Sequence, residues 1–227
     1  MTSSAQMNAP APSSLRLVLT LAIAGLISGI AIIGIYESTL PTITANKARE
    51  LREAVFKVLP GVSEMQQLVY RDGNLVVTEE RRKDEQAVYG GYDRDGDFVG
   101  YAIPAAGPGF QDTIGLLYGF APQQKHVLGM EILESRETPG LGDKIYKDAE
   151  FVGSFSALSI EPNIVAVKKG AKARPNEIDA ITGATISSKA VVRIINEAHA
   201  EWSKRLPPAG SEPPLRGTGP AGSGGSP

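Results

Sequence analysis

The sequence contains no cysteine, and only two of its 227 residues are histidine. Without cysteine, the chain cannot form a disulfide, bind zinc or an iron–sulfur cluster through thiolates, or use a thiol as nucleophile. His126 and His199 stand far apart and lack the spacing of metal ligands. We therefore expect no metal site, and any redox chemistry would require an organic cofactor.

An excess of charge of either sign is also missing. The chain has 23 Lys and Arg residues against 25 Asp and Glu residues, a formal net charge of −2. A nucleic-acid-binding surface normally makes a domain basic. We expect no nucleic-acid partner.

Both ends of the chain lack the apolar residues that a folded core requires. Residues 1–14 are small, polar and proline-containing, and residues 207–227 are mostly proline, glycine and other small residues. Such compositions cannot bury enough apolar surface to offset the entropy of ordering. We predict a disordered N-terminus over 1–14 and a solvated Pro/Gly tail over 207–227.

One long apolar run stands near the N-terminus. Residues 17–36 carry no charge, and twenty helical residues match the thickness of a bilayer core. A cleaved secretory signal would have a shorter apolar core followed by a small-residue cleavage site, and a buried soluble helix would show a polar face. We predict a transmembrane helix over 15–36 that anchors the protein in a lipid bilayer.

The remaining residues, 45–206, predict a single α+β domain with an antiparallel sheet bracketed by helices. An amphipathic helix over 45–59 ends at Pro60-Gly61. Strands follow over 66–70, 74–78, 86–92, 98–103, 113–121, 127–135 and 164–170, and the Asp-Gly pairs at 72–73 and 95–96 mark hairpin turns. A last helix, from about Ile186 to Arg205, has an apolar stripe.

The segment before this last helix reads Asp179-Ala-Ile-Thr182-Gly183-Ala184-Thr185. Gly183 and Ala184 would let a large group approach the backbone, and a helix N-terminus favours an anion. A phosphate ester on Thr185 would meet both conditions. The alternative is that Thr185 or Ser187 merely caps the helix.

A second segment, Glu137-Thr138-Pro139-Gly140-Leu141-Gly142, follows a predicted strand. Thr138 must be extended ahead of Pro139, and Gly140 suits the positive-φ position of a type II turn. Two glycines around Leu141 would let backbone amides lie against a flat ligand while the leucine packs on it. A sharp connector without a ligand is the alternative.

Together, the two segments resemble the FMN-binding domain family found in subunits of ion-pumping membrane oxidoreductases. Within that family, the single N-terminal span, the chain length and the Ala166–Gly170 segment are most similar to the G subunit of the Rnf electron-transport complex. The resemblance covers roughly Leu17 to Arg205.

The resemblance implies that Thr185 carries FMN through a phosphoester bond, placed there by a flavin transferase. It implies that Asp179 serves recognition by that transferase, and that the cofactor contacts the residues of both motifs: Glu137, Thr138, Pro139, Gly140, Leu141, Gly142, Thr182, Gly183 and Ala184. It assigns no catalytic residue, so the chain need not be an enzyme by itself.

The resemblance further implies a place in an assembly of several subunits in the bacterial inner membrane, with the soluble domain in the periplasm. There the chain would relay electrons within an ion-translocating ferredoxin:NAD oxidoreductase. Two alternatives stay open at this point: a C-type subunit of the sodium-pumping NADH:quinone reductase, and a cofactor-free, membrane-anchored binding domain.

Overall fold

The computed structural model describes residues 13–78, 80–82 and 85–216, in two compact units divided between Arg49 and Glu50. The predicted disorder over residues 1–12 and 217–227 therefore lies outside the described residues.

Helix α1, Ser14–Val58, contains the predicted membrane span and continues beyond it. In the described part of the chain, it is the one helix long and apolar enough to cross a membrane. The sequence predicted a separate helix over 45–59, but the structure has one continuous helix that passes through Pro41. Hydroxyl groups nearby supplement the backbone bonds, since Thr39 donates to the carbonyl of Ile35 and Thr44 to that of Leu40, both at 2.9 Å.

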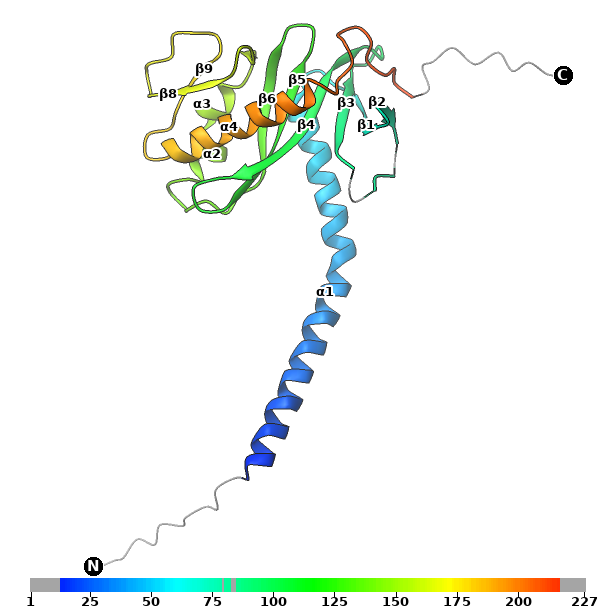
Figure 1. Cartoon of the computed structure of the whole chain (residues 1–227), viewed down its shortest axis with the longest axis vertical. Coiled ribbons are helices and arrows are strands. Elements are labelled where there is room, and N and C mark those ends of the chain that lie inside the picture. The colour runs from blue at the N-terminus through cyan, green and yellow to red at the C-terminus, as the bar shows by residue number, and fades with distance from the viewer. Residues whose placement is uncertain (1–12, 79, 83–84, 217–227) are drawn as a thin grey trace, which may run out of the picture. The chain divides into compact units, whose positions relative to one another are not determined.

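The second unit is built on a seven-stranded antiparallel sheet of order β2-β1-β3-β4-β5-β6-β7 (Figure 1). The sheet contains six of the seven predicted strands and both predicted hairpins. Asp72 and Gly73, with φ of 51° and 87°, form the first tight turn. The strands are β1 Glu64–Arg71, β2 Asn74–Val77, β3 Ala87–Tyr92, β4 Phe98–Pro108, β5 Thr113–Ala121, β6 His126–Glu134 and β7 Leu158–Ser159.

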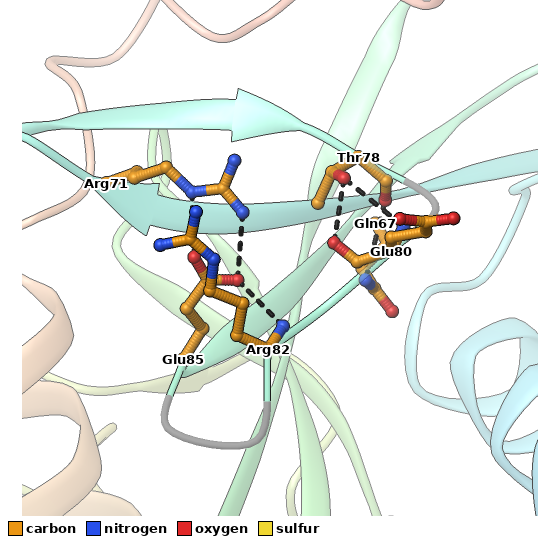
Figure 2. A network of polar contacts seen from close by, with 6 residues as sticks. All are labelled: Gln67, Arg71, Thr78, Glu80, Arg82 and Glu85. Atoms are coloured by element: carbon orange, nitrogen blue, oxygen red, sulfur yellow. Dashed lines mark hydrogen bonds and ion pairs between the residues drawn. The ribbon is translucent and has the colours of Figure 1, made fainter.

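The segment between β2 and β3 is tied to the sheet by an arginine–carboxylate pair. Figure 2 shows the Arg71 guanidinium donating two hydrogen bonds to Glu85, at 2.7 and 2.9 Å, while the backbone N–H of Arg82 donates to the same carboxylate at 3.0 Å. The bond from Arg71 lowers the pKa of Glu85 to about 2. This pair fixes the chain where β1 ends and β3 is about to begin.

The two faces of the sheet are covered by different helices. On one face, helix α4, Thr185–Trp202, buries Val191, Ile195 and Trp202 against residues such as Tyr118 of β5. On the other face, the last turns of α1 and Leu59 pack on side chains from β3, β4 and β5. Because neighbouring residues of a strand point to opposite faces, one sheet serves both cores. The predicted antiparallel sheet bracketed by helices is confirmed.

The close approach of α1 to the sheet depends on glycine. A Cβ atom on Gly119 of β5 would lie 2.0 Å from the carbonyl oxygen of Val58. No side chain fits in that space, so glycine allows the backbone of the helix end to rest on the strand.

The rest of the unit consists of short elements between β6 and α4. They are α2 Lys144–Lys147, α3 Ala149–Gly153, β8 Val165–Val167 and β9 Glu177–Asp179. Strands β8 and β9 pair in parallel, a small sheet that the sequence did not predict beyond the strand over 164–170. Strand β9 leads directly into the Thr182–Thr185 segment.

The chain after α4 differs from the prediction of a solvated tail over 207–227. Residues 207–216 run back along the sheet, where Tyr92 donates to the carbonyl of Pro213 and Gln66 donates to that of Pro214 at 2.9 Å. The backbone N–H of Arg216 returns a bond to Gln66 at 3.0 Å. Composition alone misses this because the contacts use backbone carbonyls, which every residue supplies, proline included.

Candidate functional site

Both sequence motifs line one cleft of about 340 Å³. The walls come from three chain segments: the loop between β4 and β5, the loop after β6, and the entry to α4. Its lining residues are Phe110, Thr138, Leu141, Gly142, Gly183, Ala184, Thr185, Ile186 and Ser187. The fold thus brings residues 138–142 and 183–187 together across more than 40 positions of sequence.

The loop after β6 is a tight turn, as the sequence predicted. The carbonyl of Thr138 accepts the backbone N–H groups of Leu141 at 3.1 Å and Asp143 at 3.4 Å. Gly140 has a φ of 78°, which favours glycine. The turn leaves the side chain of Leu141 exposed beside the cleft.

Glu137, which the sequence predicted to contact the cofactor, lies behind the lining of the cleft. It is buried, and its carboxylate does not line the cleft. One oxygen accepts the backbone N–H groups of Phe110 at 2.9 Å and Gln111 at 3.0 Å, and the other accepts the hydroxyl of Ser187 at 2.6 Å. Glu137 therefore joins all three segments that form the cleft.

The electrostatics of Glu137 reflect two opposing effects. Burial alone would raise the pKa of this carboxyl, but the hydrogen bonds from Ser187, Gln111 and Phe110 stabilise the ionised form and hold the pKa below its usual value. A carboxylate that accepts several donors stays charged at neutral pH. It can then hold the loops in place without a cation beside it.

Glycine permits this arrangement at Gly142. A Cβ atom there would lie 2.4 Å from Oε2 of Glu137 and 3.0 Å from Oγ of Ser187. The close approach of the loop to the α4 entry thus excludes any larger residue.

The Thr182–Thr185 segment turns the chain from β9 into α4. Gly183 has a φ of 83°, and Ala184 occupies the N-cap position, so neither Thr182 nor Thr185 caps the helix. Thr185 is the first helical residue and is exposed, with its hydroxyl 3.3 Å from the carbonyl oxygen of Ile181. Ser187 uses its hydroxyl on Glu137. The capping alternative is therefore wrong for both Thr185 and Ser187.

Asp179 does not line this cleft. Its carboxylate accepts the backbone N–H of Gly170 at 2.9 Å, and it faces a second cleft of about 220 Å³. That cleft also contains Lys169, Lys172 and Ile181, on chain adjoining the Thr182–Thr185 turn. The first residue of the motif and its last thus belong to different surfaces.

The sequence missed three lining residues, Phe110, Ile186 and Ser187. Phe110 could have been found from the sequence, because it is an aromatic residue directly after the turn-forming Gly107, Pro108 and Gly109. Ile186 is apolar at a helix start where the stripe of α4 faces elsewhere. Nothing local marked Ser187, because its partner lies 50 residues away.

The lining fits a flavin mononucleotide. Phe110, Leu141 and Ile186 expose 63, 52 and 59 % of their surfaces, apolar area that a flat aromatic ring would cover. At Thr185, the first turn of α4 presents N–H groups to an anion. The apolar walls and the anion-binding end thus match the two ends of FMN.

Comparison with known proteins gives the same assignment. The sequence model of the "FMN-binding domain" family matches residues 109–200. The chain is 29% identical to the G subunit of the ion-translocating oxidoreductase complex of Methanosarcina acetivorans, over 81% of this chain and 91% of that protein. It is 32% identical to the G subunit of the proton-translocating ferredoxin:NAD(+) oxidoreductase complex of Clostridium ljungdahlii, over 76% of this chain and 82% of the relative.

Two solved structures share the fold. NqrC of Shewanella oneidensis superposes with a TM-score of 0.58 at 18% identity, over 67% of this chain and 91% of the other. The C subunit of the Na(+)-translocating NADH-quinone reductase from Parabacteroides distasonis gives 0.56 at 18% identity, over 71% and 94%.

The long apolar helix and the matched relatives together make this a single-pass membrane protein. Because about a third of the aligned residues are identical over most of the length of such relatives, the chain belongs to the family of G subunits of ion-translocating oxidoreductase complexes, the Rnf type, and carries their FMN-binding domain.

Proposed function

We propose that this chain is the membrane-anchored flavoprotein subunit of an ion-translocating ferredoxin:NAD oxidoreductase and relays electrons through FMN bound covalently at Thr185. Relatives from Acetobacterium woodii and Clostridium ljungdahlii carry that complex in their names. The observation that carries the proposal is the single cleft that has the Thr138–Gly142 loop on one wall and the exposed Thr185 on another.

The chain's own residues account for binding. Phe110, Leu141 and Ile186 would cover the ring, and Thr138, Gly142, Gly183 and Ala184 would bring backbone close to it. Glu137 acts one step further away, by holding Phe110 and Ser187 in place. When bound, the flavin supplies the redox chemistry, while the protein sets position and local charge.

Attachment requires a separate transferase and FAD. The Thr185 hydroxyl loses its proton as Oγ bonds to the phosphorus on the FMN side, the pyrophosphate bond of FAD breaks, and AMP leaves. Thr185 suits this step because the residue is exposed at the cleft and its hydroxyl does not cap the helix. We propose that the transferase recognises Asp179, which faces the neighbouring cleft and does not line the flavin cleft.

Thr185 then keeps the cofactor on this chain, so the protein exchanges electrons, and not flavin, with the other subunits of the complex. We place the domain on the periplasmic side of the inner membrane, with α1 as the anchor.

Two other functions have less support. A C-type subunit of the NADH:quinone reductase shares the fold, but that likeness is at 18% identity, whereas G subunits reach 38%. A cofactor-free binding domain required the threonines to be caps, and Ala184 holds that position.

The test is to express the full chain with and without a flavin transferase and to measure its intact mass and in-gel flavin fluorescence. We expect one FMN adduct, mapped to Thr185 by peptide analysis and absent in Thr185→Ala. Thr182→Ala, which changes the neighbouring threonine, should reduce loading less. A bare polypeptide after co-expression, or an adduct on another residue, would overturn the proposal.

A further inference from the structure

Lys144 is a cation near the Thr182–Thr185 turn that the proposed binding set does not use. It begins the short helix α2, directly after the loop that ends at Gly142 and Asp143. Its Nζ lies 3.7 Å from the position that a Cβ atom on Gly183 would occupy. Gly183 itself lines the cleft, two residues before Thr185.

In the described part of the chain Lys144 forms no ion pair, although the hydrogen bond from Lys147 and, less strongly, the charge of Lys144 lower the pKa of the adjacent Asp143 carboxyl. In the part of the chain that the structure describes, the neighbouring carboxylate of Asp143 pairs instead with Lys147, at 2.5 Å. Lys144 has no carboxylate within 4.0 Å among the same residues and is half-buried. An ammonium that is not engaged in an ion pair is available to an anion bound beside it.

We infer that Lys144 is the counter-ion of the phosphodiester that links FMN to Thr185. The inference rests on the proposed function, because the anion exists only after attachment. Lys144 acts as a positioning residue: its ammonium approaches across Gly183, and the first turn of α4 supplies backbone N–H groups from the other side. Gly183 has no side chain to block this approach.

The expected size follows from the partial exposure of Lys144. Ion pairs that solvent reaches contribute modestly, which corresponds to about a fivefold effect on an equilibrium constant. The effect should appear only in flavinylated protein and should weaken as the salt concentration rises.

The experiment is a thermodynamic cycle in the full chain in detergent. Native chain and Lys144→Met are each prepared with and without FMN, and unfolding is followed by far-ultraviolet circular dichroism. FMN attachment should lower the unfolding equilibrium constant of both proteins, and the decrease should be about fivefold larger in the native chain than in Lys144→Met. Lys144→Arg should restore most of the difference.

Lys204→Met is the matched control. It removes the same charge from an exposed lysine just past the far end of α4, a helix about 27 Å long at 1.5 Å per residue that begins at Thr185. It should leave the loading effect unchanged.

A loading effect that is equal in native chain and Lys144→Met overturns the inference, even if Lys144→Met loads slowly, because slow loading alone would indicate a transferase contact. Equal loss in Lys204→Met also overturns it. If the native chain acquires no FMN at Thr185, the proposed function has failed instead.

Discussion

Glu137 offers the sharpest test of how the cleft is held together. Its carboxylate accepts two backbone N–H groups, from Phe110 and Gln111, and the hydroxyl of Ser187. Glu137→Gln keeps the shape but removes the charge and one acceptor oxygen. Glu137→Ala leaves all three donors without an acceptor.

The magnitude follows from those three bonds. Hydrogen bonds to a charged group contribute more than neutral ones, by about 1 kcal/mol each, and a buried donor left unpaired costs about 1–3 kcal/mol. We expect Glu137→Gln to lower the free energy of unfolding by about 2 kcal/mol and Glu137→Ala by about 4 kcal/mol.

The assay is urea unfolding of the full chain in detergent, followed by Trp202 fluorescence. Trp202 is the only tryptophan in the sequence and is buried at the end of α4, so its emission reports the core. Measurements in a Thr185→Ala background avoid flavin absorbance. Glu134→Gln, three residues upstream and exposed, is the control and should change stability by no more than about 0.5 kcal/mol. If Glu137→Gln behaves like Glu134→Gln, the three bonds do not hold the loops.

The difference in stability between the native chain and Glu137→Gln should depend on pH. Because the pKa of Glu137 is lowered in the folded state from an ordinary value of 4.5, its stabilising effect is complete above about pH 5 and is lost as the pH falls through the folded value. The stability gap between the native chain and Glu137→Gln should therefore be constant near neutrality and shrink below about pH 4.5. A gap that widens on acidification would contradict the assignment.

Two further outcomes follow from the structure, and a third tests the proposed periplasmic location of the domain. Gly119→Ala should destabilise the domain by about 2 kcal/mol or more, since its Cβ would collide with the Val58 carbonyl. Gly115→Ala, on the same strand, is the control, because its Cβ would meet nothing closer than 3.6 Å. Equal urea midpoints for the two variants would disprove the close packing of the end of α1 on β5. Arg71→Met should lower stability at pH 7 and remove the acid sensitivity that Glu85 contributes as the pH falls from 4.5 toward 2, as a pH series of thermal melts would show. Because the chain has no cysteine, Ser203→Cys should react with a membrane-impermeant maleimide in spheroplasts and Ser14→Cys only after permeabilisation; the reverse pattern would place the domain in the cytoplasm.

Local features of the fold were predictable because each depends on residues near one another in sequence. The Asp72-Gly73 turn follows from residues that tolerate positive φ, and the positive φ of Gly140 follows from its place after Pro139. The strands from β1 to β6 and the stripe of α4 follow from periodicity. Helix α1 shows the limit of such signals, since the sequence predicted separate helices over 15–36 and 45–59 where the structure has one continuous helix.

The candidate site was predictable in part for the same reason. The two motifs could be recognised in the sequence. Their position on one cleft could not be predicted, because contacts between segments more than 40 residues apart produce no pattern in the local sequence. The burial of Glu137 was missed for this reason. Its partners, Phe110 and Ser187, lie 27 and 50 residues away.

The sequence by itself predicted that this chain spans a membrane once, excluded thiol chemistry, and revealed the Asp179–Thr185 motif ahead of the last helix. Only the tertiary structure decided which groups surround that motif: a buried carboxylate that joins three segments, an unpaired lysine across Gly183, and three uncovered apolar side chains. The physical reason is that composition and spacing act along the chain, whereas hydrogen bonds, charge pairing and burial depend on distances that exist only after the sheet and its helices have packed.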